Sequence, residues 1–199
     1  MNSKATSPNL HNPDIPVYGV VADRASLHAV LENIRHHRLT LVSAPPVTAR
    51  QPPSAQFVHD TDLLTAWHGL QERERDLPAL FWHSLQALEF AAPGISVAAE
   101  SVTGADECAA YIADYLRDHL SEHIIYVLDD LHYLASAPQA ERWLRELVRL
   151  IPPTCHLVLI SRALPDLPLA ELIGSGAMFS LSGQERLKFT AEDASQARQ

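Results

Sequence analysis

Two consecutive carboxylates, Asp129 and Asp130, directly follow a run of five apolar residues at 124–128. A carboxylate at the end of a buried strand is costly to desolvate unless it is paired, hydrogen-bonded or bound to a metal ion. In a sheet that handles phosphate, the first aspartate would hold Mg²⁺ and the second would polarise water. The same pattern also allows a plainer role, in which one of the two aspartates caps the following turn.

A third charged side chain, Arg162, follows another apolar run, and an arginine at a strand end can reach a terminal phosphate. Pairing with one of the two aspartates is the alternative, and the sequence leaves both open. The polar segment 43–51 follows a third apolar run. Ligands of open parallel sheets bind beyond the carboxyl ends of the strands. These three segments therefore mark the candidate site.

Hydrophobic patterning predicts the elements that would position these groups. Expected strands cover 39–43, 65–70, 124–128 and 156–162, with a short last strand within 177–190, and expected helices cover 26–37, 77–90, 106–120 and 140–151. Unbroken apolar runs are typical of strands buried on both faces. Strands that alternate with helices favour a doubly wound sheet. We therefore expect a three-layer α/β fold, with a mostly parallel sheet of about five strands and helices on both faces.

The length fits one α/β domain, or at most two small ones, and the composition argues against nucleic-acid binding. The chain has 199 residues, 47% of them apolar, and a formal charge of −9. An acidic chain is poorly suited to neutralising a phosphate backbone. The closest group of basic residues, Arg142, Arg145 and Arg149, has the spacing of an outer helix face. This spacing favours a solvated face over a phosphate-binding patch.

Other features of the sequence are typical of ordinary globular structure. Cys108 and Cys155 are too few for a disulfide framework and are expected in the core. His119 and His123 stand one helical turn apart, which is metal-ligand spacing, but with no evident third ligand a surface location is favoured. The apolar runs are too short for a transmembrane segment and the start does not resemble a signal peptide. We therefore expect a cytoplasmic protein without membrane contact.

Five segments, in order, resemble the nucleotide-binding core of the STAND ATPases, above all the large bacterial transcription activators of the maltose-regulator and LuxR type. The segments are HRLTLVSAP at 37–45, AWHGLQERERDLPALFWHSL at 66–85, VLDDLHYL at 127–134, CHLVLISRALPDLPLAEL at 155–172 and LKFTAEDA at 187–194. The resemblance implies a P-loop NTPase fold. It also implies a Mg²⁺ site at Asp129, a catalytic acid at Asp130 and a phosphate-sensing role for Arg162.

The chain departs from this family at the phosphate-binding loop. The family's AGFGKTT falls on residues 46–52 without a gap, so its glycines fall on Val47 and Ala49, its lysine on Arg50 and its Mg²⁺-binding threonine on Gln51. A phosphate nest needs inward-turned N–H groups and some residues at positive φ. β-Branched residues resist positive φ, and prolines supply no N–H.

The two polar replacements in this loop are poor substitutes. The planar guanidinium of Arg50 does not replace a lysine ammonium in a tight loop. Gln51 coordinates a cation weakly compared with a well-placed hydroxyl. We therefore expect weak or absent binding of ATP or ADP with Mg²⁺, and no other cofactor. The alternative is a rearranged loop in which Arg50 is a lone phosphate ligand.

The resemblance implies a nucleotide-dependent switch, and the altered loop changes that expectation. We expect a degenerate, catalytically silent core that acts as a regulatory or protein-interaction module; an active ATP-hydrolysing switch that uses Arg50, Asp129 and Arg162 is the alternative. Expected boundaries are a disordered tail at 1–16, the core at 17–190 and the start of a linker at 191–199. Expected partners are proteins or further domains of a larger regulator, which we expect to be absent from this chain, and not nucleic acid.

Overall fold

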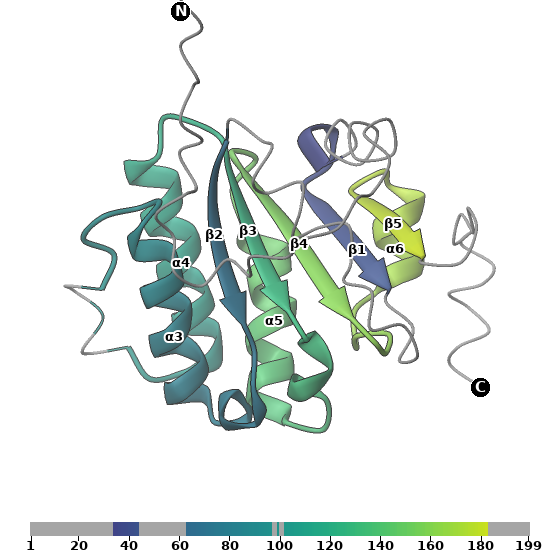
Figure 1. The fold of residues 1–199 in the computed structure, drawn as a ribbon, viewed down its shortest axis with the longest axis horizontal. Coiled ribbons are helices and arrows are strands. Elements are labelled where there is room, and N and C mark those ends of the chain that lie inside the picture. The colour runs from purple at the N-terminus through teal and green to yellow at the C-terminus, as the bar shows by residue number, and fades with distance from the viewer. Residues whose placement is uncertain (1–33, 44–62, 97–98, 100–101, 183–199) are drawn as a thin grey trace, which may run out of the picture.

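A five-stranded parallel sheet forms the centre of the molecule (Figure 1). The computed structural model describes residues 34–43, 63–96, 99 and 102–182. The strands are β1 (Leu39–Ser43), β2 (Leu64–Gly69), β3 (Ile124–Asp129), β4 (Cys155–Ser161) and β5 (Met178–Ser182). Their order is β2-β3-β4-β1-β5 and every pairing is parallel. All five carboxyl ends therefore lie at one edge of the sheet.

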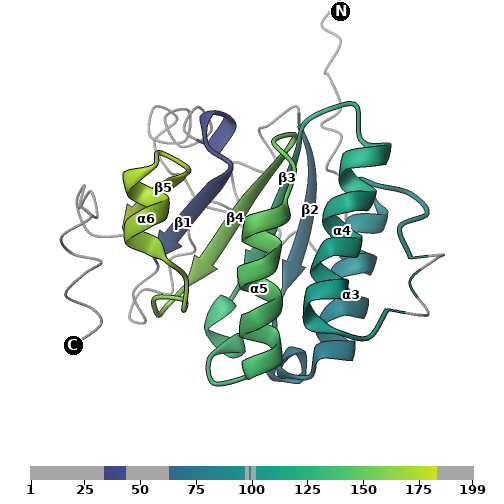
Figure 2. The ribbon, with the colours of Figure 1, turned by 180° about the vertical axis from the view of Figure 1, so that it is seen from behind.

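Helices of the described part connect and cover these strands. They are α3 (Leu77–Glu89), α4 (Ala105–His119), α5 (Pro138–Leu150) and α6 (Leu169–Gly174), with short 3₁₀ helices η2 (Glu72–Arg75) and η4 (Leu131–Leu134). Helices α4 and α5 lie against the face of the sheet that is nearer the viewer in Figure 2. Helix α3 flanks β2, the strand at one side of the sheet.

Both faces of the sheet are buried. Tyr126 and Leu128 of β3 belong to the hydrophobic core that includes α3, α4 and α5. Ile125 and Val127 alternate with them and point to the opposite face, yet they are also 0% exposed. This two-sided burial explains the unbroken apolar run and confirms the predicted three-layer α/β class.

The predicted elements agree closely with those observed, and the differences have local causes. The helix predicted over 140–151 begins earlier, at Pro138, because proline is tolerated in the first helical turn. The strand predicted over 65–70 covers Leu64–Gly69. Helices η2, η4 and α6 were not predicted. Residues 34–36 are helical, as expected. The rest of the helix predicted over 26–37, the tail at 1–16 and the linker at 191–199 lie outside the described residues.

Candidate functional site

The predicted site residues of the described part meet at the carboxyl edge of the sheet. Strands β1, β4 and β3 are neighbours, and the register aligns Ser43 with Ser161. Asp129 ends β3, beside the end of β4, and Arg162 follows β4 directly. The parallel sheet thus brings Asp129, Asp130 and Arg162 together, as the sequence predicts. Arg50 and Gln51, the other predicted ligands, lie outside the described residues.

Asp129 is a partly buried carboxylate held at the exit of β3. Its Oδ1 accepts the backbone N–H of Asp130 at 2.8 Å, and its carbonyl oxygen accepts the N–H of Leu70 at 3.0 Å. Burial raises its pKa from 3.8 to about 6, and the neighbouring charge of Asp130 acts in the same direction. The N–H bond and the charge of Arg162 oppose this shift only in part. A nearby cation would relieve this uncompensated charge.

Asp130 adopts a left-handed backbone conformation, with φ 56° and ψ 39°. Its Oδ1 lies 3.6 Å from Arg162 Nη2 and 3.6 Å from His132 Nδ1. These distances are too long for hydrogen bonds, so both contacts are loose. The side chains of Asp130 and Arg162 are 41% and 56% exposed. Of the two plainer alternatives, the pairing of Arg162 with an aspartate is present. The turn η4 has no side-chain capping bond, because Asp129 accepts only the N–H of its neighbour Asp130.

Ser161 fixes the backbone that carries Arg162. It is 3% exposed, and its Oγ accepts the N–H of Ala163 at 3.3 Å. This bond ties the turn that follows β4 to the strand itself. The backbone from which the Arg162 side chain extends is therefore held in place.

The side chains in the described part of this edge are of the types that bind a magnesium nucleotide. A carboxylate is the ligand type that Mg²⁺ prefers, and Asp129 would hold the ion. A guanidinium matches a phosphate group, and Arg162 would contact it. When bound, Mg²⁺ neutralises phosphate charge. The residues expected to cradle the phosphates fall in the loop outside the described residues.

The three arginines of α5 form a solvated face, as favoured from the sequence. Each pairs with a carboxylate at the surface: Arg142 Nε with Asp106 Oδ1 at 2.7 Å, Arg145 Nη1 with Asp166 Oδ2 at 2.7 Å, and Arg149 Nη2 with Glu146 Oε2 at 2.7 Å. All three guanidinium groups are exposed and already have acidic partners. The prediction of a solvated face is confirmed.

The two histidines with metal-ligand spacing do not come together. The ring of His119 stacks on Tyr115, with centroids 4.0 Å apart. His123 instead places Nδ1 2.8 Å from His156 Nε2. Both His119 and His123 are exposed, so the favoured surface location is confirmed.

Both cysteines lie in the core and are chemically quiet. Cys108 is 1% exposed and Cys155 is 0% exposed, and neither forms a disulfide. Burial raises the pKa of the Cys108 thiol to about 11 and that of Cys155 further still. The thiolate forms that would react or bind metal are therefore disfavoured at neutral pH.

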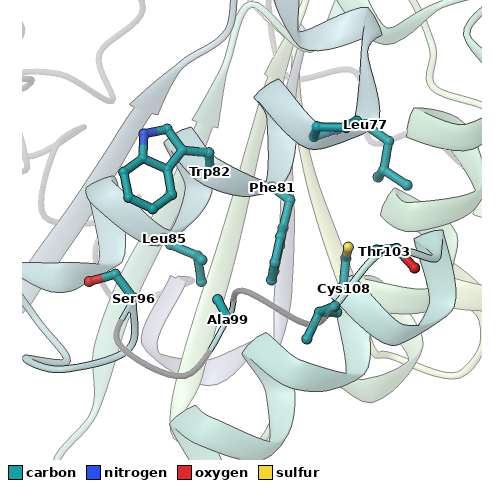
Figure 3. Close-up of a pocket in the computed structure, with 10 residues that line it drawn as sticks. Leu77, Phe81, Trp82, Leu85, Ser96, Ala99, Thr103 and Cys108 are labelled. Carbon is teal, nitrogen blue, oxygen red and sulfur yellow. The ribbon is translucent and has the colours of Figure 1, made fainter.

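A separate apolar cavity of about 290 Å³ lies between α3, α4 and the segment that joins them (Figure 3). Phe81 and Leu85 of α3 line it opposite Ala99. Trp82 contributes to its rim and is 52% exposed, whereas Trp67 and Trp143 lie in the core. The cavity contains none of the strand-end residues. It is therefore distinct from the candidate site.

The sequence did not reveal one cluster of possible metal ligands. His68, Glu74 and His83 come together beside β2, on three successive elements. Their spacing matches no short ligand motif, so only the folded arrangement reveals them. Among the described residues, no helix combines the length and apolarity needed to cross a bilayer.

Comparison with known proteins identifies relatives among bacterial regulators. No family model matches the chain. It is 27% identical over 182 residues to the HTH-type transcriptional regulator MalT of Serratia proteamaculans, and equally to MalT of Yersinia enterocolitica. Each match covers 89% of this chain, which spans about a fifth of the relatives' length (20%). The similarity shows homology to MalT, a STAND P-loop NTPase transcription regulator, and confirms the predicted resemblance.

Among solved structures, the fold resembles that of Drosophila ORC bound to DNA. The TM-score is 0.52 at 13% identity, and the match covers 86% of this chain and 94% of that one. At this identity the likeness concerns the fold alone. It agrees with the predicted three-layer α/β fold.

Proposed function

We propose that this chain, a homologue of part of the MalT regulators, is an NTPase-like core whose nucleotide site is weak or silent. In this proposal it serves as a regulatory or protein-interaction module of a larger regulator. One contrast supports it. Asp129, Asp130 and Arg162 remain at the sheet edge, while residues 46–52 contain neither glycine nor lysine.

The negative charge of the described edge supports the proposal that nucleotide binding is weak. Two carboxylates, Asp129 and Asp130, face one guanidinium, that of Arg162. A nucleotide adds further negative charge at this edge, and a standard phosphate loop offsets it with backbone N–H groups and a lysine. Pro46 and Pro52 supply no N–H, and the remaining loop residues lack the lysine. Repulsion by the carboxylates is therefore poorly compensated.

The second candidate function is an active nucleotide switch that uses Arg50, Asp129 and Arg162. The raised pKa of Asp129 favours it, because a carboxylate that is uncompensated in the free protein is the kind that a bound Mg²⁺ would stabilise. This candidate predicts phosphate release from ATP that falls in Asp129→Asn and in Arg50→Ala. Unchanged release in both variants would rule it out.

We infer that the partners are proteins or other domains of a larger regulator. The formal charge of −9 disfavours direct contact between this chain and a nucleic-acid backbone. Relatives that regulate transcription make the cytoplasm the expected location. Crosslinking of the chain in a bacterial lysate, followed by identification of the molecules that it captures, tests this inference. Enrichment of nucleic acid instead of protein would contradict it.

Isothermal titration of Mg-ATP and Mg-ADP into the purified chain tests the proposed weak site. We expect dissociation constants above ~100 µM, which corresponds to about −5.5 kcal/mol. Tighter binding contradicts the proposal. If tighter binding is seen, Asp129→Asn and Arg162→Gln show whether it occurs at the sheet edge, and Arg142→Gln serves as the control for loss of a surface arginine.

A further inference from the structure

A histidine–carboxylate cluster lies at the carboxyl end of β2. His68 is near the end of β2, Glu74 belongs to η2 and His83 to α3. One nitrogen or oxygen atom from each of the three side chains lies within 4.8 Å of the other two. Because the three elements follow one another along the chain, the local fold alone brings the side chains together.

Glu74 is a fully buried carboxylate with its orientation fixed. It is 0% exposed, and its Oε2 accepts the backbone N–H of Gln71 at 2.8 Å. Its Oε1 lies 3.1 Å from Arg73 Nε and 2.8 Å from His83 Nδ1. Buried carboxylates are generally paired or bound to a metal ion. The N–H bond from Gln71 resembles the supporting bonds that orient metal-binding carboxylates.

The hydrogen bonds of His68 select the tautomer in which Nε2 is free to bind a metal ion. Ser84 Oγ donates its proton to the carbonyl oxygen of Leu80 at 2.7 Å. It therefore accepts from His68 Nδ1 at 3.3 Å, which places the ring proton on Nδ1. His68 Nε2 then carries a lone pair, is buried and has no hydrogen-bond partner in the described structure. An unsatisfied buried acceptor is costly, and a neutral imidazole nitrogen is a common metal ligand.

His83 supplies the third donor and the access route. Its Nδ1 lies at hydrogen-bond distance from Glu74 Oε1, but the contact lacks hydrogen-bond alignment. Its side chain is 25% exposed, so the cluster is reachable from solvent. Arg73, which also contacts Glu74, is 58% exposed and can return to water at small cost.

We propose that His68, Glu74 and His83 form a binding site for a divalent transition-metal ion, with Zn²⁺ the best fit. Two imidazoles and one carboxylate form a donor set that zinc accepts, whereas Mg²⁺ and Ca²⁺ favour all-oxygen sites. Zinc bonds of about 2.0–2.1 Å place tetrahedral ligands about 3.3 Å apart. In the fold His83 Nδ1 and Glu74 Oε1 lie 2.8 Å apart and all three donors lie within 4.8 Å of one another, which brackets that spacing. The bound ion fastens the end of β2 to η2 and α3 and leaves a fourth position for water.

Metal binding to the full chain tests this proposal. The chain is stripped with a chelator, desalted, and titrated with Zn²⁺ in competition with a chromophoric chelator; Co²⁺ provides a spectroscopic readout. We expect one tightly bound ion per chain and the intense visible absorption of four-coordinate Co²⁺. His83→Gln and Glu74→Gln each weaken Zn²⁺ binding at least about 100-fold, more than loss of a supporting bond does, and abolish that absorption.

A matched variant and a folding check keep the result interpretable. His123→Gln alters an exposed histidine that pairs with the buried His156, away from the cluster, and we expect it to leave Zn²⁺ affinity unchanged. His83 is partly exposed, so its variant retains the fold, and thermal unfolding without metal verifies this. Zinc raises the unfolding temperature of the native chain but not of His83→Gln. Native binding no tighter than that of His83→Gln, or equal loss in His123→Gln, overturns the proposal.

Discussion

The two adjacent aspartates at the end of β3 differ in environment. Asp129 is partly buried, and its charge is incompletely offset by one N–H bond and by Arg162. Asp130 is more exposed and is held in a left-handed backbone conformation, from which it reaches Arg162. The first residue therefore carries an electrostatic cost and the second a conformational one. Both costs are measurable in the isolated chain.

The electrostatic cost of Asp129 predicts a pH-dependent effect of Asp129→Asn. The folded pKa of about 6 exceeds the ordinary 3.8, so the folded chain binds more protons between these values. The carboxyl group therefore contributes stability below about pH 4 that is lost as pH rises through about 6. At pH 7.5, Asp129→Asn should raise the free energy of unfolding by about 1–3 kcal/mol. Near pH 4 it should change little. Urea unfolding at both pH values measures this, and equal or lower stability of the variant at pH 7.5 would contradict it.

The conformation of Asp130 predicts an order of stability for two small substitutions. Asp130→Gly and Asp130→Ala both remove the contact with Arg162, so they differ mainly in backbone cost. At φ 56° a Cβ atom is unfavourable, and glycine is not penalised. Asp130→Gly should therefore be more stable than Asp130→Ala by about 1 kcal/mol. Chemical denaturation of the two variants side by side measures the difference, and the reverse order would refute the argument.

At the scale of elements, the hydrophobic pattern of the sequence predicted the main strands and helices. The apolar runs located β3 and β4, and the apolar stripes located α3, α4 and α5. The apolar runs also placed Asp129, Asp130 and Arg162 at strand ends. Their proximity followed from the parallel arrangement of the strands. The contact between Asp130 and Arg162 depends on a left-handed residue, which periodicity does not reveal. Helices η2 and η4 were missed because a single 3₁₀ turn has no detectable period.

The cluster on β2, η2 and α3 shows a second limit of sequence reading. His68 occupies a strand position that favours apolar residues, and Glu74 lies in a charged stretch typical of surface turns. Nothing in their spacing indicates a shared site. Their proximity follows from the way η2 folds the chain between β2 and α3, which is a tertiary feature.

Two tryptophans on different helices test the described packing. Trp143 of α5 is 0% exposed, whereas Trp82 of α3 is 52% exposed. Trp143→Ala should cost about 3–5 kcal/mol because it opens a cavity in the core. Trp82→Ala should cost less than about 1 kcal/mol, as expected away from the core. Denaturant midpoints measure both, and similar losses in the two variants would contradict the assigned burial.

At the scale of the whole molecule, the sheet and the loop contribute separately to function. The order β2-β3-β4-β1-β5 places β1 between β4 and β5, while the chain continues from β1 to the far strand β2. Such a change of direction creates a crevice at the carboxyl ends of the strands, whatever the loop composition. A fold of this kind persists when its site chemistry changes. The sheet edge is therefore expected to accept a functional loop.

The most direct test is calorimetric titration of Mg-ATP into the native chain and into a variant in which residues 46–52 are replaced by AGFGKTT. We predict that the native chain binds more weakly than ~100 µM and that the variant binds at least about tenfold more tightly, a gain of about 1.4 kcal/mol. Asp129→Asn in the variant background should remove most of that gain. A native chain that binds more tightly than ~100 µM, or a variant with no gain, would contradict the proposal that loop composition silences this site.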